Sequence, residues 1–178
     1  MSSKNLSMKV VLLGYMASGK SSIGKLLAKS LNYDFVDLDE EIAKHVGMNV
    51  PDIFSKKGEL FFRKMETQVL TSILQEERAV VVSLGGGTPC YGQNMELINT
   101  HTSYSFYLNL PIPSLVERIE KEKENRPLVA AIPNKELPEF IGKHLFERAP
   151  FYAKASQTIF TQNKTKEEVV NEIAEYLV

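Results

Sequence analysis

The segment Gly14–Gly24, GYMASGKSSIG, constrains the fold of this chain more than any other part of its sequence. It follows the apolar run KVVLL at 9–13, which is typical of a buried strand. It leads into KLLAKSLN, whose apolar residues have helical spacing. A turn between a strand and a helix needs about one glycine, because a single residue can supply the unusual backbone angle. The extra glycines and the lysine indicate that this turn also wraps a ligand.

Residues 14–21, GYMASGKS, match the phosphate-binding pattern G-x-x-x-x-G-K-[ST], the P-loop. In such a loop the backbone N–H groups point at phosphate oxygens, and the following helix adds its positive end. We expect Lys20 to reach the β- and γ-phosphates of ATP and the Ser21 hydroxyl to bind Mg²⁺. The other loop residues expected to contact the nucleotide are Gly14, Ala17, Ser18, Gly19 and Ser22.

Strand-like runs alternate with helix-like segments along the rest of the chain. The further strands are predicted at 35–39, 79–84, 103–108 and 157–161. The helices are predicted at 21–31, 40–46, from 51, 59–77, 113–123, 136–155 and 165–178, with Thr165 as the last cap. This alternation favours an α/β fold with a parallel sheet covered on both faces.

Ligands of such sheets bind beyond the carboxyl ends of the strands. Three strand ends in this sequence carry unusual residues, namely Gly14, Asp37–Asp39 and Gly85–Gly87. We therefore expect these three groups to converge on one edge of the sheet, where they would form the site.

Length and charge narrow the class of protein. The 178 residues suggest one domain, with residues 1–7 as a flexible tail. The net charge of −1 favours neither nucleic acid nor an anionic membrane as a partner. The N-terminal sequence MSSKNLSMK has no apolar signal core, so we expect a cytoplasmic protein. The single Cys90 cannot form an internal disulfide.

A P-loop occurs in GTPase switches, transport ATPases and kinases. Residues 163–166, NKTK, resemble the guanine-reading motif Asn-Lys-x-Asp, but a lysine replaces the acid that would accept from guanine. A transport ATPase would need a longer chain. A kinase fits best, and a nucleotide-dependent switch or binding module without catalysis is the alternative from another class.

The run FVDLD places Asp37 and Asp39 two residues apart, so on a strand both would face the same side. Asp37 would hold Mg²⁺, and Asp39 would contact the hydroxyl that attacks the γ-phosphate. Phosphoryl transfer depends mainly on positioning and charge neutralisation, which both carboxylates would serve. The alternative is a solvated strand end at which Asp39 caps the next helix.

Three arginines suggest an anionic second substrate. Arg63 lies among apolar residues, where an unpaired guanidinium is costly, and Glu66 one turn later could pair with it. Arg126 lies in NRPLV and Arg148 in FERAPFY. An arginine fork binds carboxylate with two hydrogen bonds, so the sequence favours a small hydroxy-carboxylate. Each arginine alone could instead form a surface salt bridge.

These motifs occur together, in this order, in one family. The P-loop, DLD, DIFxxxGExxFRxxE, SLGGG, RPL and ERxPxY make residues 8–152 resemble a shikimate kinase. The resemblance implies a three-layer P-loop kinase fold with a five-stranded parallel sheet in the order 2-3-1-4-5. It also implies a substrate-binding helical segment at about 40–66 and a lid at about 120–135.

The resemblance further implies transfer of the ATP γ-phosphate to the 3-hydroxyl of shikimate, a step toward chorismate and the aromatic amino acids. ATP and shikimate would be the ligands of a monomer, with Mg²⁺ as cofactor. Lys20, Asp39 and Arg126 would be the catalytic residues. A kinase of another small hydroxy-acid, such as gluconate, is the alternative enzyme.

The family's substrate contacts carry over where the motif residues match. Asp39 would bind the ring hydroxyls, Arg63 and Arg148 the carboxylate, and Gly86, within Gly85–Gly87, would donate its backbone N–H. Glu66 would orient Arg63, Arg126 would swing from the lid onto the ATP phosphates, and Arg118 would stack on adenine. The pocket walls would be Val50, Phe54, Phe62, Pro127 and Leu128.

Overall fold

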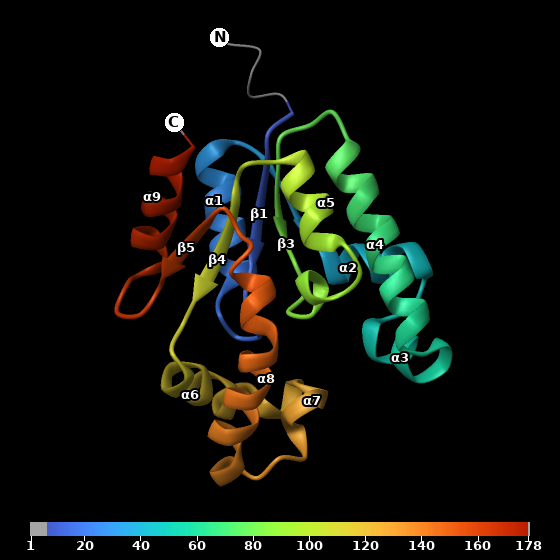
Figure 1. Ribbon diagram of the computed structural model, residues 1–178, viewed down its shortest axis with the longest axis vertical. Helices are drawn as coiled ribbons and strands as arrows, with labels where there is room; N and C mark the ends of the chain where they lie inside the picture. Colours follow the sequence, from blue (N-terminus) through green and yellow to red (C-terminus); the bar gives the residue numbers. More distant parts are fainter. Residues whose placement is uncertain (1–6, 178) are drawn as a thin grey trace.

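A computed structural model describes residues 7–177, so residues 1–6 of the expected flexible tail lie outside it. The fold is built on five parallel strands in the order β2-β3-β1-β4-β5, which confirms the predicted order (Figure 1). The strands are β1 (Lys9–Leu13), β2 (Asp34–Asp37), β3 (Val80–Ser83), β4 (Ser105–Asn109) and β5 (Gln157–Phe160).

Strand β1 is the centre of the sheet, and all five of its residues are buried. It pairs with β3 through Val10↔Val81 and with β4 through Leu12↔Phe106. A strand buried on both faces favours apolar residues, which explains the continuous run VVLL at 10–13. The buried Lys9 ammonium donates to the carbonyls of Ser7, Glu76 and Arg78.

Helices cover both faces of the sheet (Figure 1). Val10 and Leu12 pack toward α1 and α9, whereas Val11 and Leu13 pack into the larger core on the other face. The helices are α1 (Lys20–Leu31), α2 (Leu38–Val46), α3 (Val50–Lys57), α4 (Glu59–Gln75), α5 (Asn94–His101), α6 (Ile112–Glu122), α7 (Pro127–Ala130), α8 (Leu137–Tyr152) and α9 (Lys166–Tyr176). Short 3₁₀ turns form at Thr88–Cys90, Lys123–Asn125 and Asn134–Glu136.

The prediction of a strand through 35–39 was wrong at its end. Strand β2 stops at Asp37, and α2 begins at Leu38. The cause is a helix cap, because an Asp37 carboxylate oxygen accepts the backbone N–H of Glu40 at 3.2 Å. Asp39 therefore lies in the first turn of α2 rather than two residues along a strand from Asp37. Asp37, not Asp39, is the residue that caps the helix.

Two parts of the fold had no counterpart in the predicted elements. Helix α5 follows the triple glycine, and burial of its Met95 and Ile98 holds it against the core. Between α6 and α8, residues 123–136 form short 3₁₀ turns and the four-residue helix α7. Figure 1 shows α6 and α7 beyond the carboxyl ends of the strands. Among residues 7–177, no helix is both long and apolar enough to cross a membrane.

The predicted cap of the last helix forms a complete capping box. The Thr165 hydroxyl accepts the N–H of Glu168 at 3.1 Å, and the Glu168 carboxylate accepts the N–H of Thr165 at 2.6 Å. This reciprocal pair satisfies two backbone donors that the helix cannot satisfy itself.

Replacing Thr165 with alanine should lower the free energy of unfolding by about 1 kcal/mol, because the Glu168 N–H at the helix end loses its side-chain acceptor. Urea denaturation followed by circular dichroism would measure the loss. Thr100→Ala is the matched control, since Thr100 lies inside α5 and its hydroxyl only donates to the Glu96 carbonyl. The control should change stability by less than about 0.5 kcal/mol. Equal losses in the two variants would contradict the capping role.

Candidate active site

The P-loop joins β1 to α1 and forms one wall of a cavity of about 650 Å³. Gly14 and Gly19 adopt φ angles of 151° and 97°, which favour glycine. At Gly14 a side chain would also collide with the Leu108 carbonyl, since a Cβ would lie 2.8 Å away. Ala17 adopts φ 63°, so the loop holds a residue with a side chain in the left-handed region.

The first turn of α1 is left open for an anion. Its N-cap is Gly19, which has no side chain to accept the free backbone N–H groups. Those donors and the helix dipole point toward the cavity side of the loop. Ser18 is buried and its hydroxyl makes no hydrogen bond in the described part of the chain, while Ser22 bonds back to the Gly19 carbonyl.

Lys20 bends back over the P-loop, where its ammonium donates to the carbonyls of Gly14 and Tyr15 at 2.8 and 2.9 Å. Burial lowers the pKa of Lys20 to about 8, and the nearby Asp39 carboxylate opposes this shift. The ammonium group therefore lies beside the loop as a charge that is incompletely solvated. An anionic ligand in the loop would recover that lost solvation.

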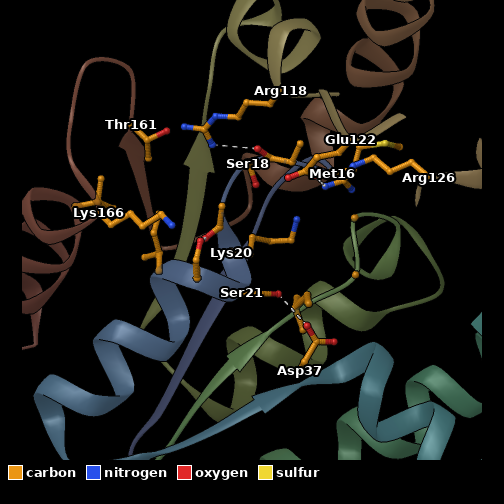
Figure 2. Close-up of a pocket in the computed structure, with 18 of the residues that line it drawn as sticks. Met16, Ser18, Lys20, Ser21, Asp37, Arg118, Glu122, Arg126, Thr161 and Lys166 are labelled. Carbon is orange, nitrogen blue, oxygen red and sulfur yellow. Dashed lines mark hydrogen bonds and ion pairs between the residues drawn. The ribbon is translucent and has the colours of Figure 1, made fainter. Parts of the chain in front are cut away.

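Ser21 and Asp37 meet at the base of the cavity, where the Ser21 hydroxyl donates to the Asp37 carboxylate at 2.9 Å (Figure 2). A hydroxyl and a carboxylate are hard oxygen ligands of the kind that Mg²⁺ takes, with phosphate and water filling the remaining positions. Residues 7–177 contain no cluster of three or more His, Cys, Asp or Glu side chains suited to a metal. The residues present thus fit a metal that arrives with a nucleotide.

Asp39 faces the same cavity from the first turn of α2. Burial raises the pKa of Asp39 to about 6, the carboxylates of Asp37 and Glu66 add to this rise, and Lys20 opposes it. At neutral pH the group is largely ionised and can accept a hydrogen bond from a hydroxyl.

The three glycines that follow β3 make room for three charged side chains. A Cβ on Gly85 would lie 2.9 Å from an Asp39 carboxylate oxygen. A Cβ on Gly86 would lie 2.9 Å from Arg148 Nη1, and one on Gly87 would lie 2.7 Å from Arg63 Nη2. Side-chain contacts this short do not occur in proteins, so each charged group occupies space that only glycine leaves free.

Arg63 is held from several sides. Its Nη1 donates to the Glu66 carboxylate at 2.9 Å, and Glu66 is only 1% exposed. The other Glu66 oxygen accepts the Thr88 hydroxyl at 2.7 Å. The guanidinium carbon of Arg63 lies 3.8 Å from the centre of the Tyr91 ring, a cation–π contact. The predicted pairing of Arg63 with Glu66 is present, and Tyr91 and Thr88 complete the arrangement.

The apolar residues named from the sequence lie on three elements, α3, α4 and α7. Phe62 is buried in α4 and Phe54 is partly exposed on α3, with ring centres 4.6 Å apart. Val50 is half-buried at the start of α3. Pro127 and Leu128 are exposed on α7. They lie near the triple glycine or the lid rather than in the cavity beside the P-loop.

Arg118 and Arg126, which follow β4 in the sequence, both lie beside the P-loop. Arg118 donates from Nη1 to the Ala17 carbonyl at 3.0 Å, and Arg126 pairs with Glu122 at 2.6 Å (Figure 2). Both arginines line the cavity together with the loop residues. Arg148 lies against Gly86 and is not among the residues that line this cavity.

One edge of the cavity was missed from the sequence. Thr161, Lys164, Thr165 and Lys166 line it, and they follow the last strand. The segment NKTK resembles a guanine-binding motif in sequence. Its position directly after β5 is the signal that it borders the cavity at the carboxyl ends of the strands. Tyr15, Thr88, Tyr91 and Tyr152 were also missed, because their partners lie far away in sequence.

Comparisons with known proteins agree on one family. A family model described as shikimate kinase matches residues 16–178. A shikimate kinase from Flavobacterium psychrophilum is 42% identical, over 95% of this chain and 98% of the relative. The solved shikimate kinase from Bacteroides thetaiotaomicron has a TM-score of 0.88 at 34% identity, covering 96% of this chain and 98% of that one. The solved complex of the Acinetobacter baumannii enzyme with shikimate has a TM-score of 0.86 at 30% identity, covering 97% and 94%. The chain therefore belongs to the shikimate kinase family.

Proposed function

We propose that this protein transfers the γ-phosphoryl group of ATP to the 3-hydroxyl of shikimate, giving 3-phosphoshikimate and ADP. Family membership supports the reaction. The observation that supports the choice of substrate is the triple glycine turn, where one carboxylate and two guanidinium groups each lie within 3 Å of the Cβ position of one of the three glycines. A small acid with several hydroxyls matches that combination of charges.

The nucleotide half of the site is the P-loop. The backbone N–H groups of residues 14–22 bind the phosphates, Lys20 exchanges its two carbonyl partners for β- and γ-phosphate oxygens, and Arg118 packs on the base. Ser21 and Asp37 would hold Mg²⁺, which would neutralise charge on the phosphates. Thr161 and Lys166 border the base end of the cavity.

The substrate half is the turn at Gly85–Gly87 with its three neighbours. Asp39 accepts a hydrogen bond from the attacking hydroxyl and so orients the lone pair of that hydroxyl oxygen toward the γ-phosphate. Arg63 and Arg148 bind the carboxylate, and the Gly86 N–H donates to the substrate. Glu66 keeps Arg63 oriented, and Phe54 and Phe62 contact the apolar face of the ring.

A kinase must keep water away from the γ-phosphate, because water competes with the acceptor hydroxyl. We assign residues 120–135 as the lid and residues 40–66 as the substrate-binding segment. On closure Arg126 leaves Glu122 and contacts the phosphates, where its charge stabilises the transition state. Lys20, Asp39 and Arg126 are then the catalytic residues.

We also infer that the enzyme works as a monomer in the cytoplasm, without a nucleic-acid or membrane partner. One chain supplies all the residues named above for both substrates. The net charge of −1 gives no field that would attract polyanions.

The reaction is tested by ADP release from Mg·ATP with shikimate, gluconate or quinate as acceptor. Shikimate alone should stimulate release, and chelation by EDTA should abolish it until Mg²⁺ is restored. Stimulation by gluconate instead would assign the other hydroxy-acid kinase. ATP binding without stimulation by any acid would favour a binding module.

Replacing Gly87 with alanine should raise the KM for shikimate about ten- to a hundredfold, because the new methyl group displaces the Arg63 guanidinium from its seat. Gly87 has φ −91°, so alanine causes no backbone strain there. The KM for ATP should stay within about twofold, since Gly87 does not line the nucleotide cavity.

Gly142→Ala in α8 is the control for this substitution, because its Cβ would meet the Ile112 side chain at an ordinary 3.8 Å. Steady-state kinetics of both variants would measure the KM for shikimate and the KM for ATP. A Gly87→Ala enzyme with the wild-type KM for shikimate would show that Arg63 does not bind this substrate.

Glu122→Gln should lower the KM for ATP about two- to fivefold, because Arg126 no longer has to leave an ion pair before it contacts phosphate. Glu139→Gln is the control, since Glu139 forms a comparable pair with Lys143 on α8, away from the cavity. An unchanged KM for ATP in Glu122→Gln would argue that Arg126 does not reach the nucleotide.

A further inference from the structure

The P-loop residue Tyr15 bonds to a helix that follows the lid. Its hydroxyl lies 2.9 Å from Nδ1 of His144 in α8, and the two rings meet edge to face with centres 5.4 Å apart. Tyr15 is 1% exposed. The P-loop pattern leaves this position free, so phosphate binding does not require an aromatic residue there.

Burial keeps both groups of this hydrogen bond uncharged. Burial raises the pKa of Tyr15 to about 12, so its hydroxyl keeps its proton at neutral pH. Burial, and then the Arg148 charge, lower the pKa of His144, so the imidazole is neutral. The Tyr15 O–H can therefore donate to Nδ1 of His144 in the tautomer whose proton lies on Nε2, and in the other tautomer Nδ1–H donates to the Tyr15 oxygen.

Tyr15 also contacts one charged group from each half of the site. Its backbone carbonyl accepts from the Lys20 ammonium at 2.9 Å. The guanidinium carbon of Arg148 lies 5.9 Å from the centre of its ring. One residue of the phosphate loop thus joins the expected phosphate lysine, the expected carboxylate arginine and His144.

In helix α8, Arg148 lies between two residues that form hydrogen bonds to other parts of the site. His144, Arg148 and Tyr152 are four residues apart, so they lie along one face of the helix. The Tyr152 hydroxyl donates to the Gly86 carbonyl at 2.6 Å. The helix is thereby attached to the P-loop on one side of Arg148 and to the triple glycine turn on the other.

We propose that Tyr15 and His144 are a positioning pair for the kinase reaction: their hydrogen bond fixes α8 against the P-loop and so sets Arg148 for the substrate carboxylate. This inference rests on the proposed function. The P-loop is anchored by β1 and α1 at its two ends, whereas α8 follows the lid segment directly. Loss of the bond should therefore displace the helix and its arginine rather than the phosphate loop.

Calorimetric titration of purified variants with shikimate and with Mg·ADP tests the pair. Tyr15→Phe keeps the buried ring and removes the donor, so the Kd for shikimate should rise about three- to tenfold. The Kd for Mg·ADP should stay within about twofold. His144→Leu should reproduce this loss, and the double variant should bind shikimate no more weakly than the weaker single variant.

Two further variants separate positioning from packing. His144→Gln keeps an oxygen that can accept from Tyr15, so it should bind shikimate within about twofold of the wild type. Tyr33→Phe is the matched control, because its hydroxyl bonds to the Met8 sulfur at 3.4 Å, far from the site in the fold. It should leave both affinities unchanged.

The inference is overturned if Tyr15→Phe binds shikimate as the wild type does. It is also overturned if shikimate and Mg·ADP weaken equally, or if the losses of the two single variants multiply in the double variant. Circular dichroism checks that each variant folds. If His144→Leu does not fold, the result with Tyr15→Phe alone decides the inference. A wild type that fails to bind shikimate would overturn the proposed function itself, whereas a wild type that binds while Tyr15→Phe binds equally well overturns the pair alone.

Discussion

Three successive residues without side chains, Gly85–Gly87, are the constraint on which the substrate side of this structure depends. Each position is filled by a charged group from another element: Asp39 from α2, Arg148 from α8 and Arg63 from α4. These helices are far apart in the sequence, and the turn is where they converge. A carboxylate and two guanidinium groups can all lie against the Gly85–Gly87 turn because the backbone of this turn contributes no side chain.

The cations around the site differ in how firmly the protein holds them, and burial explains the difference. Glu66 is 1% exposed and also accepts from Thr88, so removing it from Arg63 would leave a buried charge without a partner. The Glu122 side chain is 58% exposed, so water can replace Arg126 at little cost. Arg63 is therefore a fixed part of the site, whereas Arg126 can move from one anion to another. This agrees with the proposed roles of Arg63 in substrate binding and of Arg126 on a lid.

Local patterns in the sequence predicted the framework of the fold. Apolar runs located the buried central strands such as β1 and β3, and GxxxxGKS located the phosphate loop, because both depend on neighbouring residues. The boundary at Asp37 was wrong since FVDLD fits a strand, and only the bond from Asp37 to Glu40 shows that a helix has begun. Contacts across the fold could not be predicted in this way. Tyr15 and His144 are 129 residues apart, and neither lies in a pattern that names the other.

The two halves of the site rest on different kinds of support. The P-loop is continuous with β1, whose residues are all buried, so the central sheet fixes its position. Arg148 is carried by α8, which packs into the core through Leu137, Ile141 and Tyr152. Hydrogen bonds of His144 and Tyr152 lie one helical turn on either side of Arg148. The hydrogen bonds of Tyr15 and Tyr152 add polar links to this packing. They join α8, which follows the proposed lid segment, to the P-loop and to the triple glycine turn.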